Sequence, residues 1–251
     1  MTRLYYPESL SLNRMVVLQN DHIHYLRNVL RQEVGAQVNL FNGREGEWQG
    51  EITSLTKSRG EVLLRHCLRE PEVETPVTLI FCPIKNDPLH YLIEKCTEIG
   101  VTIFQPVLME RGNIHKINRE KLQRIAVEAS QQCERLSVPE VRDLRSLKET
   151  LDDWPQGAIL YSCAERWRES NHQKHILGSS EDKTKVAGKG SSSTGESVFL
   201  KASLIGPEGG ISPKEIELLC RYPFVQFISL GKNILRAETA AVVAATKMIL
   251  G

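Results

Sequence analysis

Leu204-Ile-Gly-Pro-Glu-Gly-Gly210 and Leu230-Gly-Lys-Asn-Ile-Leu-Arg-Ala-Glu-Thr-Ala240 are the stretches that decide the fold of this chain. The first predicts a buried strand that runs into a glycine-rich turn. The second predicts another strand, a glycine, and a polar step into an alanine-rich helix. Glycines at such turns let main-chain N–H and C=O groups touch a flat ligand directly. Each turn alone is either a tight bend or a ligand cradle, but the pair predicts one composite small-molecule site.

From Val77 onward the sequence alternates strand and helix patterns. Val77 to Cys82 is a nearly continuous apolar run, which is typical of a strand buried on both faces. Further strands are expected at 101–109, 157–163, 198–205 and 225–230, and helices at 87–99, 119–136, 213–221 and 238–250. This alternation predicts a mainly parallel sheet with helices on both faces. Such sheets bind ligands at the carboxyl ends of their strands.

The first 70 or so residues have a different pattern, that of a small β-rich domain. Short apolar runs at 15–18, 37–41 and 61–64 are separated by turn signals, and Asn42-Gly43 predicts a hairpin. A helix is expected at 22–30, with Ile23, Leu26 and Leu30 on one face. The proline- and acid-rich segment 70–76 predicts a linker to the second domain.

Composition excludes several classes of protein. The chain has 251 residues, a net charge of +1 and no apolar run long enough for a membrane span. Its N-terminus lacks the apolar core of a secretory signal, so we expect a cytoplasmic protein. The six cysteines are at least fourteen positions apart, which predicts reduced thiols and no zinc site. His172 and His175 lie in a polar stretch, where we expect solvated side chains and no metal.

Two polar segments leave their roles open. Five Lys or Arg side chains between Arg111 and Arg124 form either a solvated surface or a phosphate-contacting patch. Residues 168–197 contain almost no large apolar side chains, which predicts a flexible surface loop. Within it, 188–195 is glycine- and serine-rich but lacks the phosphate-loop pattern, so no nucleotide site is expected there.

The two opening stretches resemble the bacterial 16S ribosomal RNA uridine-N3 methyltransferase family (RsmE type), in the SPOUT class of trefoil-knotted methyltransferases. Other segments agree with the same family. They are Arg3-Leu-Tyr-Tyr-Pro7, His24-Tyr-Leu-Arg-Asn-Val-Leu-Arg31, Glu94-Lys-Cys-Thr-Glu-Ile-Gly-Val101, Glu110-Arg111 and Glu128-Ala-Ser-Gln-Gln-Cys-Glu-Arg-Leu-Ser-Val-Pro-Glu140. The resemblance therefore covers most of the chain outside 168–197.

The resemblance implies an α/β fold with an N-terminal PUA-like β-barrel that helps bind RNA (1–71). It also implies a C-terminal knotted methyltransferase domain (77–251) that binds S-adenosylmethionine and forms a homodimer. The expected partner is small-subunit rRNA or a ribosomal particle. The expected cofactor contacts are Ile205, Gly206, Pro207, Glu208, Gly209, Gly210, Ser229, Leu230, Gly231, Ile234, Leu235, Arg236, Thr239 and Ala240.

Within this resemblance, the implied reaction transfers a methyl group to N3 of a uracil, which must lose its proton. The site therefore has to stabilise developing negative charge or supply a base. Arg236 is the candidate for charge stabilisation, with Glu238 as its orienting partner or the base; an ion pair is the alternative role for both. The candidate RNA contacts are Arg3, His24, Arg27, Arg31, Arg111 and Arg135.

Three features depart from the family pattern. Asn233 stands where arginine is common, Gln131 replaces a usual glutamate, and the segment 168–197 is longer than usual.

Two alternative functions also stay open. One is an RNA-binding protein whose catalytic site has decayed, and the other is a related methyltransferase that acts on a different RNA.

Overall fold

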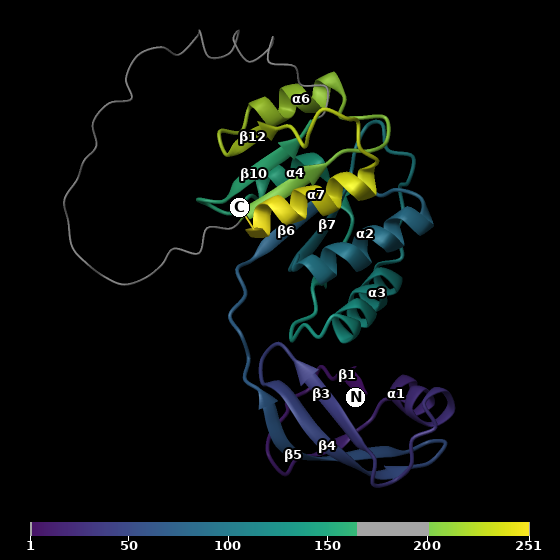
Figure 1. Cartoon of the computed structure of the whole chain (residues 1–251). Helices are drawn as coiled ribbons and strands as arrows, with labels where there is room; N and C mark the ends of the chain where they lie inside the picture. The colour runs from purple at the N-terminus through teal and green to yellow at the C-terminus, as the bar shows by residue number, and fades with distance from the viewer. Residues whose placement is uncertain (1, 165–200, 251) are drawn as a thin grey trace, which may run out of the picture. The chain divides into compact units, whose positions relative to one another are not determined.

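The structure is a computed structural model that describes residues 2–164 and 201–250. The chain divides into two compact units (Figure 1). Among the described residues, unit 1 comprises 2–74, 93–102 and 118–141, and unit 2 comprises 75–92, 103–117, 142–164 and 201–250. The sequence did not predict that 93–102 and 118–141 would cluster with the N-terminal residues. The predicted loop 168–197, with its histidines 172 and 175 and its glycine-rich segment 188–195, lies outside the described residues.

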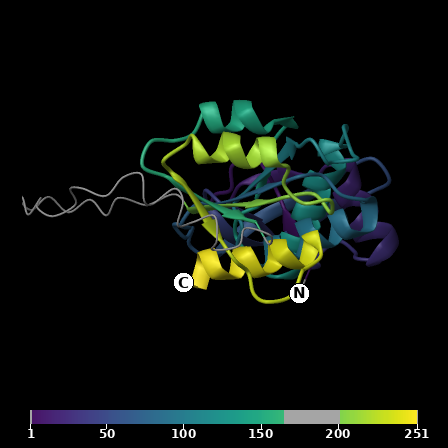
Figure 2. The same ribbon diagram turned by 90° about the horizontal axis from the view of Figure 1, so that it is seen from above.

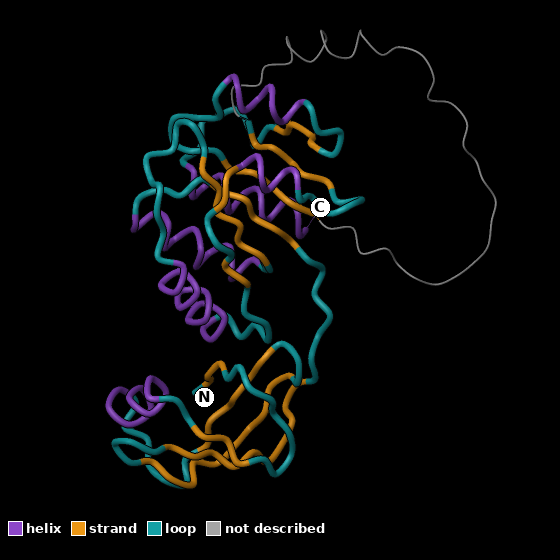
Figure 3. Tube along the Cα trace, turned by 180° about the vertical axis from the view of Figure 1, so that it is seen from behind, coloured by secondary structure: helices purple, strands orange, loops and turns teal. Residues whose placement is uncertain are grey.

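Unit 1 is built on a sheet with the strand order β1-β3-β4-β5-β2 (Figure 3). Its strands are β1 (Arg3–Tyr5), β2 (Met15–Val17), β3 (Gln37–Asn42), β4 (Gly46–Leu55) and β5 (Gly60–Arg69). The predicted hairpin is confirmed, since β3 and β4 pair antiparallel with Asn42 opposite Gly46. Gly46 has a φ of +80°, and a Cβ there would lie 2.0 Å from the Arg69 carbonyl oxygen. Only glycine fits this turn.

The predicted N-terminal helix forms as two consecutive turns of different geometry. Helix α1 (Asn20–His24) continues into the π-helical turn η1 (Tyr25–Val29). Ile23 and Leu26 are buried in the core of the sheet and Leu30 packs against it, as their spacing predicted. Unit 1 also contains α3 (Arg119–Gln132) and the short strand β8 (Glu140–Val141). The helix α2 (Asn86–Ile99) has its first residues in unit 2 and its last in unit 1.

Unit 2 contains the predicted parallel sheet, with the strand order β12-β10-β11-β6-β7. These strands are β6 (Val77–Phe81), β7 (Ile103–Leu108), β10 (Ile159–Cys163), β11 (Lys201–Ile205) and β12 (Val225–Ile228). A two-residue strand, β9 (Arg145–Ser146), also pairs with β7. Helices α4 (Leu147–Asp152) and α6 (Pro213–Cys220) lie on one side of the sheet, and α7 (Ala237–Leu250) lies on the other (Figure 2). The short elements β8, β9 and α4 were not predicted.

The carboxyl ends of four neighbouring strands lie in one row. Ile205 at the end of β11 is paired with Phe81 of β6 on one side and Cys163 of β10 on the other, and Cys163 is paired with Ile228 of β12. Strand β12 is at the edge of the sheet, whereas α7 contacts β11 and β6. The segment 229–236 must therefore cross back from the edge toward the middle strands. This crossing brings the two glycine turns to the same end of the sheet.

No helix among the described residues has the length and apolar character needed to cross a bilayer.

Candidate functional site

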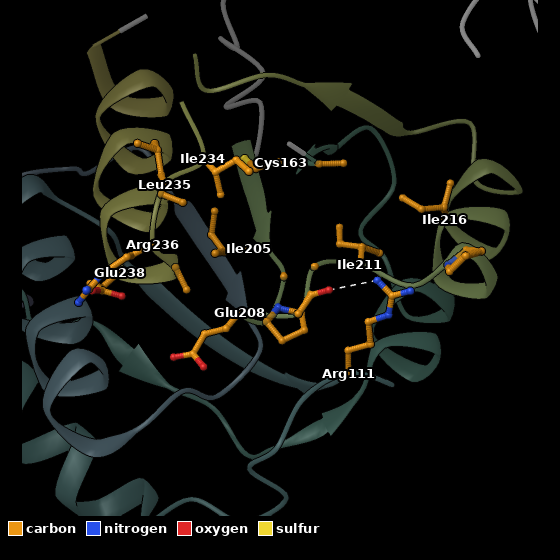
Figure 4. Close-up of a pocket in the computed structure, with 18 of the residues that line it drawn as sticks. Arg111, Cys163, Ile205, Glu208, Ile211, Ile216, Ile234, Leu235, Arg236 and Glu238 are labelled. Atoms are coloured by element: carbon orange, nitrogen blue, oxygen red, sulfur yellow. Dashed lines mark hydrogen bonds between the residues drawn. The ribbon is translucent and has the colours of Figure 1, made fainter. Parts of the chain in front are cut away.

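A cavity of about 1130 Å³ opens at the carboxyl ends of β10 and β11 (Figure 4). It is lined by the first glycine turn, by the segment that leads into α7, and by one face of α6. The size is that of a pocket for a nucleoside-sized or larger ligand. The predicted cofactor residues that line it are Ile205, Gly206, Pro207, Glu208, Gly209, Gly210, Ile234, Leu235, Arg236 and Ala240.

The first glycine turn needs its glycines for reasons visible in the structure. A Cβ on Gly206 would lie 2.8 Å from Ile211 Cγ1, which would force the isoleucine to move. Gly210 has a φ of +74°, in the left-handed region that favours glycine, and its N–H donates to the Pro207 carbonyl at 2.8 Å. The turn is therefore tight and internally bonded.

Helix α6 follows this turn and begins with the predicted capping box. The Ser212 hydroxyl accepts from Glu215 N at 3.2 Å, and the Glu215 carboxylate accepts from Ser212 N at 2.8 Å. The other Glu215 oxygen accepts from Glu110 N at 2.7 Å, which ties the helix to the turn after β7. The exposed Glu110 carboxylate has a lowered pKa, chiefly because the Ser212 hydroxyl donates to it. The start of α6 is thus fixed by several hydrogen bonds.

The second glycine turn contributes less directly to the cavity. Ser229, Leu230, Gly231 and Thr239 were predicted to contact the cofactor, but they do not line the cavity. Ser229 Oγ instead closes the turn by donating to the Gly231 carbonyl at 3.1 Å. Gly231 has a φ of +144°, so glycine is favoured here for the backbone alone. Ile234 follows this turn and lines the cavity, and the residue is 73% exposed.

Arg236 and Glu238 both line the cavity where α7 begins (Figure 4). Arg236 is exposed and Glu238 is partly buried. Within residues 2–164 and 201–250, neither side chain forms an ion pair, so the predicted alternative of a mutual pair does not occur there. Their charges are available to a ligand. Asn233 is exposed and does not line the cavity.

Sequence reasoning missed part of the cavity wall. Cys163 and Ala164 come from the end of β10, and Ile211, Ile216 and Cys220 come from the segment that enters α6 and from α6 itself. The register of β10 against β11 places Cys163 beside Ile205, and a strand alignment is not visible in a single sequence. The only available signal was the apolar residue Ile211 directly after the glycine turn.

The residues of the cavity fit a cofactor with a flat heterocycle, such as S-adenosylmethionine. Ile205, Ile211, Ile234 and Leu235 offer apolar surface for a flat heterocycle. The glycine turn leaves open space beside Gly210, where nothing lies within 4 Å of the position that a Cβ would take. Among the described residues no cluster of His, Cys, Asp or Glu has the makings of a metal site.

Two arginines predicted to contact RNA have other roles in unit 1. Arg3 is 7% exposed; its Nε lies 3.1 Å from Glu47 Oε2, and it donates to the carbonyls of Ser130 and Arg135. The Arg135 side chain is 8% exposed and pairs with Glu74 at 2.6 Å. Both guanidinium groups are therefore buried and paired within unit 1, and their contact with RNA stays a prediction. Gln131 also has a structural role, since its Oε1 accepts from Tyr5 N at 2.9 Å.

Three other predicted RNA residues lie together on α1, η1 and the following turn. His24 and Arg31 are exposed, and Arg27 is partly buried with its Nη1 3.2 Å from Asn28 Oδ1. Tyr25 and Val29 are 40% and 57% exposed on the same segment. Arg31 has a φ of +52°, which is uncommon for a residue with a Cβ. The structure brings these side chains onto one segment of unit 1.

Arg111, the sixth predicted RNA contact, lines the cavity instead of a separate surface. Its Nη1 donates to the Gly209 carbonyl oxygen at 3.1 Å (Figure 4). The basic window from Arg111 to Arg124 is thus divided: Arg119 Nε donates to the Val141 carbonyl at 2.7 Å, while Lys116 is exposed.

Two family models match the chain. Residues 71–249 match an RNA methyltransferase domain, and residues 18–64 match an RNA methyltransferase PUA domain. A ribosomal RNA small subunit methyltransferase E from Rickettsia conorii is 31% identical over 99% of this chain and 95% of its own length. A protein of the same name from Synechocystis is 31% identical over 95% of this chain and 73% of its own length.

Solved structures agree over the full length. A ribosomal RNA small subunit methyltransferase E from Neisseria gonorrhoeae, bound to S-adenosylmethionine, has a TM-score of 0.78 and 28% identity over 99% of this chain and 96% of that chain. A Legionella pneumophila protein in complex with the same cofactor has a TM-score of 0.75 and 27% identity over 99% of this chain and 97% of that chain. The two-part organisation of this chain is therefore shared with proteins that bind S-adenosylmethionine.

Proposed function

We propose that this chain, which belongs to the family of ribosomal RNA small subunit methyltransferases E, methylates N3 of a uridine in small-subunit rRNA. The methyl donor is S-adenosylmethionine. One observation carries this proposal. The glycine turn at 206–210 and the entry to α7 line one cavity at the carboxyl ends of the parallel strands. That cavity is lined by apolar side chains, by the glycine turn, and by the charged side chains of Arg236 and Glu238.

The cofactor, when bound, supplies an electrophilic methyl group. The chain itself must hold the uracil and deal with the proton on N3. Arg236 stabilises the negative charge that develops on the uracil as this proton leaves, because its guanidinium is unpaired at the cavity wall. Glu238, two residues later, either orients Arg236 or accepts the proton. Holding the base against the methyl donor contributes roughly 7–11 kcal/mol to lowering the barrier.

Cofactor binding and catalysis are separable by mutation. Arg236→Ala should lower kcat by about 10²–10³-fold, which is the usual cost of removing a group that stabilises an anion in the transition state. Binding of S-adenosylhomocysteine, measured by calorimetry, should change much less. Loss of cofactor binding in this variant, with normal kcat at saturating cofactor, would contradict the catalytic role.

We infer that RNA is held in part by α1, η1 and the residues that follow. Exposed Tyr25 offers a ring for stacking on an unpaired base, and Arg27 and Arg31 offer charge for neighbouring phosphates. The target base must be splayed out of its surroundings for its N3 edge to reach a methyl donor. Replacing both Arg27 and Arg31 with alanine should weaken RNA binding without changing cofactor affinity.

A homodimer is part of the same proposal. The helix α7 carries apolar residues on more than one face, and Leu250 near its end is 81% exposed. A helix that is apolar all round needs a partner on its open side. Light scattering on the purified protein should give twice the chain mass of 28.4 kDa.

The decisive genetic experiment is nucleoside mapping of rRNA from a strain that lacks this gene. Loss of N3-methyluridine from small-subunit rRNA, with recovery on complementation, is the expected result. If the N3-methyluridine content is unchanged and another modified nucleoside is lost, the protein is instead a related methyltransferase that acts on a different RNA nucleotide. Absence of thermal stabilisation of the protein by S-adenosylhomocysteine would favour an RNA-binding protein without catalysis.

A further inference from the structure

We propose that Arg111 is a positioning residue that locks the cofactor-binding turn, and that it is not an RNA contact. The proposal rests on the proposed function, because it takes the cavity to be the cofactor site. It concerns the peptide group between Gly209 and Gly210, which lies in the turn that closes one side of that cavity.

This peptide group is held at both ends. Its carbonyl oxygen, on Gly209, accepts from Arg111 Nη1 at 3.1 Å. Its N–H, on Gly210, donates to the Pro207 carbonyl at 2.8 Å. A peptide between two glycines has little steric resistance to rotation, because neither residue has a Cβ. Without the Arg111 bond, only the Pro207 bond would oppose a flip that exchanges the directions of the C=O and N–H groups.

The aliphatic part of Arg111 also packs on the turn. A Cβ on Gly209 would lie 3.2 Å from Arg111 Cβ and 3.7 Å from Arg111 Cδ. The glycine is therefore in close contact with the arginine stem, and the contact leaves room for hydrogen and little more. Arg111 supports the turn by packing as well as by its hydrogen bond.

Arg111 is itself well placed to act as a fixed support. The preceding residue, Glu110, donates its N–H to Glu215 at the start of α6. The following residue, Gly112, donates to the Met109 carbonyl at 3.0 Å, and a Cβ there would lie 2.5 Å from the buried Cys82 Sγ. Both neighbours of Arg111 are thus hydrogen-bonded within unit 2. The backbone of Arg111 is therefore held in place, and its side chain can fix the position of the cofactor turn.

Within the ranges that the structure describes, no carboxylate lies at ion-pair distance from Arg111. Among these residues, no carboxylate therefore competes with the Gly209 carbonyl oxygen for the Arg111 guanidinium. Arg111 lines the same cavity as the turn it supports. These contacts distinguish Arg111 from Lys116, an exposed basic residue of the same sequence window.

The test compares Arg111→Met with Lys116→Met in the full chain. Each change removes one positive charge, while methionine keeps most of the aliphatic stem. We expect Arg111→Met to weaken S-adenosylhomocysteine binding, measured by calorimetry, by about tenfold, as for loss of one charge-assisted hydrogen bond. We expect a raised KM for the methyl donor, a nearly unchanged kcat at saturating donor, and unchanged RNA affinity. Lys116→Met should leave S-adenosylhomocysteine binding unchanged.

The outcomes are separable. Equal S-adenosylhomocysteine affinity in the wild type and Arg111→Met, or weaker RNA binding as the main effect of Arg111→Met, would overturn the inference. A wild-type protein that does not bind S-adenosylhomocysteine at all would instead overturn the proposed function. Thermal melting of each variant without ligand checks that the fold is kept, and a second change at the same contact, Gly209→Ala, should also weaken S-adenosylhomocysteine binding.

Discussion

Arg3 and Arg111 carry the same charge, and their surroundings decide what each charge does. Arg3 is the first residue of β1 in the sheet of unit 1, and its side chain lies beside Glu47 and over the ring of Phe41, 3.6 Å from the ring centroid. Burial lowers the pKa of Arg3, and the charge of Glu47 opposes this effect. A sequence shows that a residue is basic but not whether it is buried, so the burial and pairing of Arg3 could not be predicted from its charge.

Arg3→Ala should destabilise the protein by about 3–5 kcal/mol, because it leaves Glu47 buried without its main partner. The matched control is Arg65→Ala, whose partner Glu51 is 45% exposed and whose loss should cost about 0–1 kcal/mol. Urea unfolding of both variants measures the difference. A stable Arg3→Ala protein with weakened RNA binding would contradict the structural role of Arg3 and support the predicted RNA contact.

His22 gives a pH dependence whose sign follows from its burial. Its pKa lies below the usual value near 6.5, because burial disfavours the charged ring more than Asp21 favours it. As the pH falls through about 6.5, His22 takes up a proton in the unfolded chain before it does so in the folded chain. The free energy of unfolding should therefore fall with decreasing pH in this range.

Urea unfolding at pH 7.5 and pH 5.5 measures this effect. The variant His22→Gln should lose less stability between these two conditions than the wild type. Identical losses in both proteins would show that other groups cause the pH dependence.

At the scale of elements, the sequence predicted the capped helix α6 well, because its signals are local. Ser212, Pro213 and Glu215 stand at the positions that a capping box and a proline-led first turn require, and all of them behave as predicted. The strands of unit 2 were also predicted closely, from apolar runs bounded by turns. The short strands β1 and β9, of three and two residues, were missed because so short a run has no measurable periodicity.

Glu215 joins two elements, and removing it should affect both stability and binding. Glu215→Ala removes the acceptors for Ser212 N and Glu110 N, which should cost about 1–2 kcal/mol in unfolding free energy. It should also weaken S-adenosylhomocysteine binding, because the turn after β7 and the glycine turn lose a shared support. The exposed Lys214 provides the control, since Lys214→Ala should change neither quantity appreciably. Equal behaviour of the two variants would contradict this role.

At the scale of the whole molecule, local signals were not enough. The sequence predicted a small-molecule site from two glycine stretches, but the order β12-β10-β11-β6-β7 depends on pairings between distant segments. That order brings Cys163, Ile205 and the entry to α7 to one cavity. The same non-local packing placed 93–102 and 118–141 in unit 1 and brought Arg111 against the glycine turn, where it donates to the Gly209 carbonyl.

The central claim is that this chain transfers a methyl group to a uridine N3 of small-subunit rRNA. The most direct test incubates the purified protein with isotopically labelled S-adenosylmethionine and ribosomal small subunits from a strain that lacks the gene. Mass spectrometry of the digested rRNA should then find the label in N3-methyluridine at one position, and Arg236→Ala should reduce this signal by about 10²–10³-fold. Label in a different nucleoside, or no label in an rRNA that has lost its N3-methyluridine, would contradict the account.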